Sequence, residues 1–517
     1  MRAIEGRMPA PLRDRFNVAL AWLVDGLADP ARRRRTAFVF CVAYGALWFV
    51  YGVIAKSSQD LNADMGEMVV WSRELAWGYP KHPPLLAFVL WGWFEIFPLA
   101  DWSYILLAVV TVSIGIFVAI ELCAEWLGRE KLAAVPFLLA IIPFYNFFGL
   151  KFDQNSALIP LWALAMWAFV RSFNSRHLGW AALAGIAAVG AMLVKYWSAF
   201  LLVALAMAAV AHPKRRIYFR SAAPWVTAGV FLVAIAPHVV WLVRKNFPPL
   251  TWVATRRVST SFGDTLYSMV EALGGTFAYA AIAIALVLIF VRPRPLALAD
   301  GFLPKDERRT AAILFWIPLL LPIVPALIKN INLLSLWNTP ALNLLPVMLL
   351  GSALVVVPRV AVLRIAAVAT MLTLLFVAMS PLVAFTLLKT GVENDAAYAR
   401  LLMEATEREW HKDTGKPLKL IGGPFALVST AAFYGKDHPS TFAHFSNYLS
   451  PWVDDARIAR VGMAIMCDDT WLCRRYTDEI AARYGGASHQ AEVTLSRRWL
   501  GFQGPPARFI IAIVPPR

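Results

Sequence analysis

The chain has 517 residues, of which 59% are hydrophobic and 16% are charged. Soluble domains are about 45–50% apolar even when glycine is counted, so this composition excludes an ordinary soluble protein. The formal net charge is +16, but the basic residues lie in short clusters between apolar runs. That distribution is typical of the loops of a membrane protein and argues against a nucleic-acid-binding surface.

The apolar runs predict a polytopic α-helical membrane protein, because a helix needs about 20 apolar residues to cross a bilayer. The segment 83–98 is apolar but short, and proline flanks it on both sides, so we interpret it as re-entrant or interfacial. We predict about 11 transmembrane helices, at residues 36–54, 103–122, 132–149, 156–171, 178–194, 197–211, 222–243, 272–291, 310–328, 335–357 and 363–388.

Charge predicts the orientation. Residues 1–35 are basic and amphipathic, and they end in Arg32 to Arg35 directly before the first span, which places this N-terminal region in the cytoplasm or at its membrane surface. With an odd number of spans, the first loop (55–102) and the tail (392–517) lie on the outer side. If 83–98 were also a span, the basic clusters at 212–220 and 292–309 would move outside, against the positive-inside rule.

The tail differs in character from the membrane region 36–391. Apolar runs at 418–422, 461–467 and 508–514 predict strands, and 424–434 and 470–484 predict helices, so we expect a small soluble α/β domain. Cys467 and Cys473 can pair there in an oxidising compartment, but their spacing alone leaves the pairing open.

The most polar stretch beside a span is the first outer loop. Asp64, Glu67, Trp71 and Glu74 are spaced so that a helix brings them to one side. A carboxylate stripe next to the bilayer can act as a general base or a metal ligand. The alternative is a solvated helix face without chemistry.

Residues 63–88, ADMGEMVVWSRELAWGYPKHPPLLAF, resemble the first-loop signature of the GT-C glycosyltransferases. The resemblance is to the bacterial branch related to protein O-mannosyltransferases and lipid A aminoarabinose transferases. Met65 departs from the pattern, since the family has Glu there, and Glu67 on the same face is a candidate substitute. The matching positions are Asp64, Trp71, Ser72, Arg73, Gly78, Tyr79, His82, Pro83, Pro84 and Leu85.

Two later segments carry the resemblance further. Residues 151–167 correspond to the turn before a span where the family has an Asp, here Asn155 with Asp153 nearby. Residues 191–202 are similar to a Leu-Ser-Lys-Tyr element, with Lys195 as its lysine. The similarity covers roughly residues 36–350.

The resemblance implies an inverting glycosyltransferase on the periplasmic face of the bacterial inner membrane. It would move a sugar from a polyprenyl-phosphate carrier to an acceptor hydroxyl on a lipid, glycan or protein. In that reading Asp64 and Glu67 are catalytic. The donor phosphate is bound by Lys195, Arg256, Arg257 and His82. The substrate cavity is lined by Asp153, Asn155, Tyr79, Trp71 and Lys81.

Each role has an ordinary alternative. Lys195 can be a lysine that snorkels from a helix end, and the two arginines can bind lipid headgroups. The aromatic residues can belong to an interfacial belt. No metal ligands are assigned, although a divalent metal stays possible. The rival functions are a transporter or flippase for a lipid-linked substrate and a non-catalytic protein that binds envelope polymer. A transporter predicts internal repeats and mid-span charges, and the sequence has neither.

Overall fold

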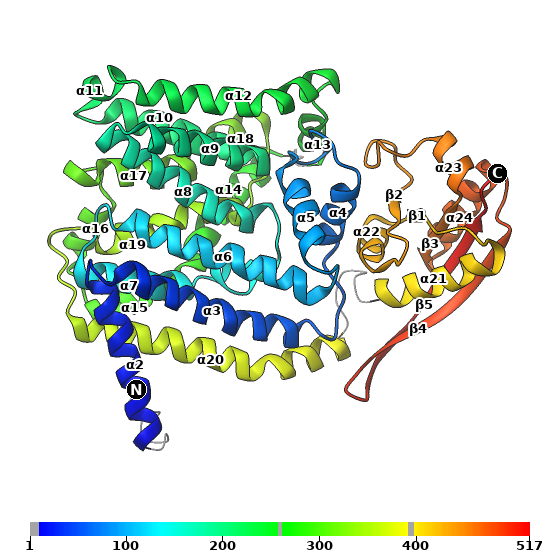
Figure 1. Cartoon of the computed structure of the whole chain (residues 1–517), viewed down its shortest axis with the longest axis horizontal. Helices are drawn as coiled ribbons and strands as arrows, with labels where there is room; N and C mark the ends of the chain where they lie inside the picture. The colour runs from blue at the N-terminus through cyan, green and yellow to red at the C-terminus, as the bar shows by residue number, and fades with distance from the viewer. Residues whose placement is uncertain (1–9, 257–260, 391–397) are drawn as a thin grey trace. The chain divides into compact units, whose positions relative to one another are not determined.

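The computed structural model describes residues 10–256, 261–390 and 398–517 (Figure 1). It is mostly helical, with one five-stranded sheet in the described part of the tail. The chain divides into two compact units. The first comprises Met1–Trp48 and Ala108–Phe376, and the second comprises Phe49–Leu107 and Val377–Arg517. The first outer loop and the tail therefore belong to one unit.

The first unit consists of helices joined by loops in its described residues, and three of its helices, α3, α6 and α20, continue into the second unit. The helices are α2 (Ala10–Ala28), α3 (Arg33–Ala55), α6 (Asp101–Cys123), α7 (Arg129–Ala140), α8 (Gln154–Ser175), α9 (Leu178–Val194), α10 (Ala199–Ala211), α11 (Arg215–Phe219), α12 (Ala223–Arg244), α13 (Pro248–Arg256), α14 (Phe262–Tyr279), α15 (Ala281–Leu286), α16 (Pro295–Phe302), α17 (Arg309–Leu320), α18 (Ile323–Lys329), α19 (Leu345–Leu350) and α20 (Arg359–Thr390).

Among the described residues, 6 helices are long and apolar enough to cross a membrane, or 8 if each of two bent pairs counts as one span. The bent pairs are α7 with Pro143–Leu150, at 79°, and α14 with Ala281–Val291, at 51°. The structure thus confirms a multi-pass helical protein but not the count of eleven. Helix α5 (Leu85–Ile96) has 12 residues, which is about 18 Å and too short to cross, as predicted for 83–98.

The predicted span at 335–357 takes a different form. Its first part is the 3-10 helix Ser335–Leu344, and the short α19 ends at Leu350. Pro340 lies within the 3-10 segment and lacks a backbone donor, which disfavours a regular α-helix there. Asn343 is fully buried, donates to the carbonyl oxygen of Ile159 at 3.0 Å and accepts from the Tyr145 hydroxyl at 2.6 Å. These polar contacts stabilise the irregular backbone inside the helical bundle.

Close helix packing in the first unit depends on small residues. Gly185 of α9 faces α12, where an added Cβ would lie 2.7 Å from the carbonyl oxygen of Thr227. The Thr227 hydroxyl in turn donates to the carbonyl oxygen of Ala181 at 2.9 Å. A small residue and an interhelical hydrogen bond are the usual means by which membrane helices associate.

The second unit combines the first outer loop with the tail. The loop contributes α4 (Ala63–Arg73) and α5, and Figure 1 shows α22 beside both. The tail elements are α21 (Ala399–Asp413), β1 (Leu420–Gly423), α22 (Phe425–Tyr434), β2 (Ser440–Ala443), α23 (Asp455–Val461), β3 (Met463–Asp468), α24 (Trp471–Arg483), β4 (His489–Trp499) and β5 (Phe502–Val514).

The sheet has the strand order β2-β1-β3-β5-β4. Strands β2, β1 and β3 are parallel, while β5 is antiparallel to both β3 and β4. Its core is built from apolar side chains of the strands and of α23, including Leu420, Phe442, Ile458, Met463 and Ile465. All three predicted strands and both predicted helices of the tail are present. The structure adds α21, α23, β2 and β4, which we did not predict.

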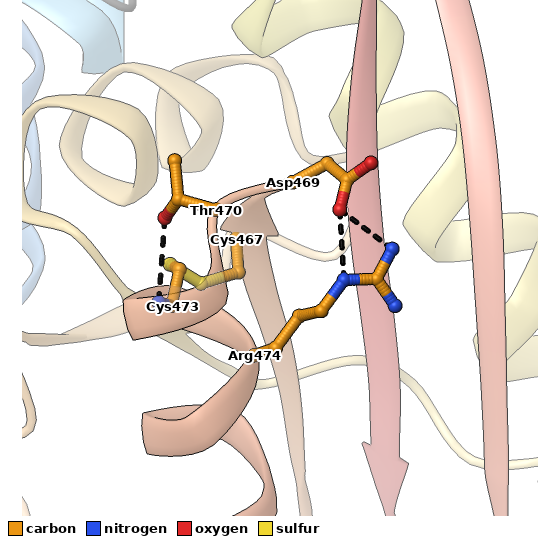
Figure 2. Close-up of a disulfide and its surroundings, with 5 residues drawn as sticks. All are labelled: Cys467, Asp469, Thr470, Cys473 and Arg474. Atoms are coloured by element: carbon orange, nitrogen blue, oxygen red, sulfur yellow. Dashed lines mark hydrogen bonds and ion pairs between the residues drawn. A yellow bond between two sulfur atoms is a disulfide. The ribbon is translucent and has the colours of Figure 1, made fainter.

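Cys467 and Cys473 form a disulfide that joins the end of β3 to the first turn of α24 (Figure 2). The Thr470 hydroxyl accepts the backbone N–H of Cys473 at 3.3 Å, and Asp469 pairs with Arg474. Asp468 lies close enough to both sulfur atoms to resemble a metal-ligand cluster, but the disulfide occupies both thiols. The pairing that the sequence left open is therefore present, and it pins the start of α24 to the sheet.

Candidate active site

The predicted acidic helix of the first loop is α4. Asn62 caps it by accepting the backbone N–H of Asp64 at 3.1 Å. Asp64 lies in the first turn and its side chain is exposed. A carboxylate at this position is stabilised by the positive end of the helix dipole. The cap and the dipole together position the Asp64 carboxylate at a helix start, toward solvent.

Glu67 has a different environment. Its Oε1 lies 2.8 Å from Lys81 Nζ, and the two side chains are only 12% and 11% exposed. The Lys81 ammonium also lies 3.7 Å from the ring centre of Phe425. Burial raises the pKa of the Glu67 carboxyl, the ammonium of Lys81 acts in the opposite direction, and the neighbouring Asp64 raises it further. Glu67 is therefore the buried counterion of Lys81.

Two aromatic residues of the loop pack on each other. Trp71 and Tyr79 are 2% and 1% exposed, and their rings stack with centroids 4.6 Å apart. The Tyr79 hydroxyl donates to the Trp71 carbonyl oxygen at 2.8 Å. Trp71 does not share an exposed face with Asp64, because its ring packs on Tyr79. A place for the two rings in a substrate cavity stays a prediction.

His82 belongs to the same packed turn. Its carbonyl oxygen accepts the backbone N–H of Tyr79 at 3.0 Å, and its ring centroid lies 6.2 Å from that of Trp71. The side chain is half-buried. These contacts fix the conformation of the loop between α4 and α5, and a role for His82 in phosphate binding stays a prediction.

In the first unit, Asp153 caps α8. Its Oδ1 accepts the backbone N–H groups of Asn155 and Ser156 at 2.8 and 3.0 Å, and the Ser156 hydroxyl completes a capping box. The Asn155 amide nitrogen donates to Asp153 Oδ2 at 3.3 Å. Lys151 Nζ lies 3.8 Å from the same oxygen. Asp153 thus orients Asn155 at the start of the helix.

Asn155 in turn holds Lys195. The Lys195 ammonium donates to Asn155 Oδ1 at 2.8 Å and lies 4.9 Å from the ring centre of Trp337. Lys195 sits at the break between α9 and the short 3-10 turn Tyr196–Ser198 that leads into α10, with an extended backbone. This contact fixes the position of the ammonium. An ammonium held in this way can bind a phosphate or carboxylate oxygen.

The two predicted arginines cannot be placed. Arg256 is the last residue of α13, but its side chain lies outside the described residues, as does the whole of Arg257. Their predicted contact with a donor phosphate stays a prediction.

Residues 81–241 match the family model of dolichyl-phosphate-mannose-protein mannosyltransferases. The lipopolysaccharide core galacturonosyltransferase RgtB of Rhizobium johnstonii is 28% identical over 251 residues, which are 47% of this chain and 49% of that protein. The chain therefore spans about half the length of the curated relative it matches.

Solved structures of ArnT from Cupriavidus metallidurans share the fold over nearly the whole chain. The structure bound to undecaprenyl phosphate has a TM-score of 0.59 at 16% identity, covering 92% of this chain and 98% of ArnT. The apo structure has a TM-score of 0.59 at 15% identity, covering 92% and 97%. The sequence match and the shared fold both make this chain similar to the GT-C membrane glycosyltransferases.

The structure brings the predicted residues together in two groups. Asp153, Asn155 and Lys195 form one contact chain in the first unit. Asp64, Glu67 and Lys81 are neighbours in the second unit. That the two groups form one site stays a prediction.

Sequence reasoning missed three side chains that support these groups: Lys151 beside Asp153, Trp337 beside Lys195, and Phe425 beside Lys81. Lys151 opens the segment that carries Asp153, so its place was visible in the sequence. Trp337 and Phe425 are separated from their partners by more than a hundred residues, and no spacing pattern indicates such contacts.

Proposed function

We propose that this GT-C protein transfers a sugar from a polyprenyl-phosphate carrier to an acceptor hydroxyl of a cell-envelope molecule, lipopolysaccharide being the first candidate. The similarity to RgtB, by name a lipopolysaccharide core galacturonosyltransferase, supports the acceptor class. The fold shared with ArnT, whose solved structure holds undecaprenyl phosphate, supports the carrier class.

Asp64 acts as the general base in this proposal. Its carboxylate takes the proton of the acceptor hydroxyl as that oxygen attacks the anomeric carbon. The new carbon–oxygen bond forms on the face opposite the phosphate, the bond to the phosphate oxygen breaks, and the polyprenyl phosphate leaves with the electron pair. The anomeric configuration is therefore inverted. The exposed position of Asp64 at the helix start supports this role.

Glu67 is less suited to be the base, because it is buried and paired with Lys81. In the proposal the pair stabilises the loop and keeps a positive charge near Asp64. Lys81 is then a positioning residue rather than one that contacts the transferred sugar.

The observation that carries the proposal is the Lys195 ammonium, positioned at a helix break by the amide oxygen of Asn155. A cation at this point binds the phosphate of the carrier and stabilises the charge that develops on it as the sugar departs. Membrane helices are broken at polar groups where the backbone lines a binding site, which fits a break at Lys195.

The location on the periplasmic side is also part of the proposal. The positive clusters at 32–35, 212–220 and 292–309 suit the cytoplasmic side. The disulfide between Cys467 and Cys473 suits an oxidising compartment for the tail.

The experiment measures transfer from a labelled polyprenyl-phosphate sugar by purified protein as the donor concentration is varied. Lys195→Met is compared with Lys245→Met, because both lysines follow the last residue of a helix. Loss of one charge-assisted contact of about 2 kcal/mol lowers kcat/KM by about 30-fold in Lys195→Met only. Equal activity of the two variants would contradict the phosphate role. Movement of the lipid-linked sugar across a vesicle without transfer would favour the transporter instead.

A further inference from the structure

The second unit contains a cavity of about 530 Å³ that the transfer chemistry does not use. It lies at the C-terminal end of α4, where Arg73 and Glu74 meet residues of β2 and α23 in the tail. Asp64 is at the other end of the same helix, nine residues or about 14 Å away along the axis. The cavity volume falls within the range of about 300–1,000 Å³ that is usual for small-molecule sites.

The charges around this cavity favour an anion. Four cationic side chains line it, from Arg73, Lys419, Arg457 and Arg460, against the two carboxylates of Glu74 and Asp454. Glu74 is engaged by Arg457 at 2.6 Å, and Asp454 accepts the backbone N–H of Arg457 at 2.6 Å as the cap of α23. With four cationic side chains against two carboxylates, the lining carries an excess of positive charge.

Two buried polar atoms at the cavity have no partner among the described residues. Arg73 donates through Nη1 to the carbonyl oxygens of Ala432 and Pro439, both at 2.9 Å, while its buried Nη2 makes no hydrogen bond. Ser440 is 3% exposed, and its hydroxyl also makes none. Buried polar groups are nearly always satisfied, so two unsatisfied donors from distant segments that line one cavity favour a ligand oxygen there.

Trp452 adds a flat apolar surface to this cationic lining. Its indole N–H donates to the carbonyl oxygen of Thr441 at 3.2 Å, which fixes the ring, and the half-buried side chain lines the cavity. A fixed aromatic ring beside an anion site fits a ligand that has both a charged group and a ring with an apolar face. Sugars that carry an acidic group have both features.

We propose that this cavity binds an anionic sugar, that is, a hexose bearing a phosphate or a carboxylate. Arg73 and Ser440 contact the anionic group, Lys419 and Arg460 hold it by charge at the cavity mouth, and Trp452 packs on the sugar ring. The site is separate from the transfer chemistry, and its occupancy does not depend on Asp64 or Lys195.

The test is a binding titration of the purified full-length protein in nanodiscs of zwitterionic lipid, followed by calorimetry. Four probes are compared: glucose 1-phosphate, galacturonate, galactose and inorganic phosphate. We expect the two anionic sugars to bind, galactose not to bind, and inorganic phosphate to bind at least 10-fold more weakly than glucose 1-phosphate. Arg73→Gln and Ser440→Ala should weaken the binding of both anionic sugars by at least 10-fold and about 5-fold, respectively.

Arg498→Gln is the matched control, because Arg498 is an exposed arginine of the same unit on β4 and does not line the cavity. Ser440→Ala removes only an unpartnered hydroxyl, so it keeps the test informative if Arg73→Gln fails to fold. Three results would overturn the proposal: no binding of either anionic sugar at about 10 mM, equal binding of galactose, or equal loss of affinity in Arg498→Gln. Equal affinity for inorganic phosphate and glucose 1-phosphate would reduce the cavity to a simple anion site and overturn its assignment to a sugar.

Discussion

Asp64 and Glu67 are three residues apart on α4, yet their surroundings separate their chemistry. Asp64 is exposed in the first turn, whereas Glu67 is buried against Lys81. The sequence spacing predicted that both lie on one face of a helix. It did not predict the ion pair between Glu67 and Lys81, which lies fourteen residues later in the chain. Solvation, which depends on the folded loop, is the reason that the proposal gives the role of base to Asp64 rather than Glu67.

The raised pKa of Glu67 predicts a pH dependence of stability. The folded protein holds this proton more tightly than the unfolded chain, so the contribution of Glu67 is most favourable below pH about 4.5 and is lost as pH rises through the raised pKa. Glu67→Gln cannot titrate. We therefore expect the stability of the wild type to fall relative to Glu67→Gln over this window.

Thermal unfolding followed by tryptophan fluorescence, from pH 4 upward, measures this difference. Glu67→Gln also removes the counterion of Lys81, so the slopes with pH are compared rather than the absolute midpoints. Parallel curves for the two proteins would show that Glu67 does not have a raised pKa.

At the scale of helices and strands, the sequence pattern predicted the elements themselves better than it predicted the contacts between them. The runs at 461–467 and 508–514 are apolar and short, and both became central strands, β3 and β5. The strands were predicted from continuous apolar runs. Strand β4 was missed because His489–Trp499 alternates half-buried and exposed positions and has no such run. Strand β2 was missed because it has only four residues. The pairing of Arg457 with Glu74 joins residues 383 apart, and no local pattern predicts such a contact.

A buried ion network joins the first loop to the tail within the second unit. The Asp60 side chain is 2% exposed, and its Oδ1 lies 3.1 Å from Arg497 Nη2. Its Oδ2 accepts the backbone N–H of Arg400 at 3.1 Å, and the guanidinium of Arg400 pairs with Asp101. Tyr434 donates its hydroxyl to Asp101 at 2.7 Å.

Removing the Asp60 carboxylate should destabilise this unit. Asp60→Ala leaves the largely buried guanidinium of Arg497 without its carboxylate, which costs about 3–5 kcal/mol in comparable buried pairs. Unfolding of the purified variants in denaturant measures the loss. Asp478→Ala is the control, because Asp478 is exposed on α24 and should change stability by less than about 0.5 kcal/mol. A loss no larger than that of the control would show that the network contributes little.

At the scale of the whole molecule, the number of spans predicted from the apolar runs differs from the number of candidate helices, and the orientation stays a prediction from charge. The described helices give 6 to 8 candidate spans by length and hydropathy, against the predicted eleven. Helices such as α9, with 17 residues, are shorter than the roughly 20 residues that a straight crossing needs. Broken helices such as the one that carries Lys195 are why the count differs, since a break shortens each part without removing the crossing.

The predicted topology has its two ends on opposite sides of the membrane. A green fluorescent protein fused before Met1 should be fluorescent, because this reporter matures in the cytoplasm. Alkaline phosphatase fused after Arg517 should be active, because that enzyme needs an oxidising compartment to form its disulfides. The converse fusions, with the reporters exchanged, should both be inactive. Activity of both reporters at the same end, or a cytoplasmic tail, would contradict the odd number of crossings.

The most direct test of the proposed function compares Asp64→Asn with Asp264→Asn in sugar transfer from a labelled polyprenyl-phosphate donor. Both residues are exposed acids in the first turn of a helix, behind a side-chain cap from Asn62 or Ser261. We predict that Asp64→Asn lowers kcat by about 10²–10⁴ with the protein still folded, while Asp264→Asn keeps wild-type turnover. Near-normal transfer by Asp64→Asn would show that this carboxylate is not the base.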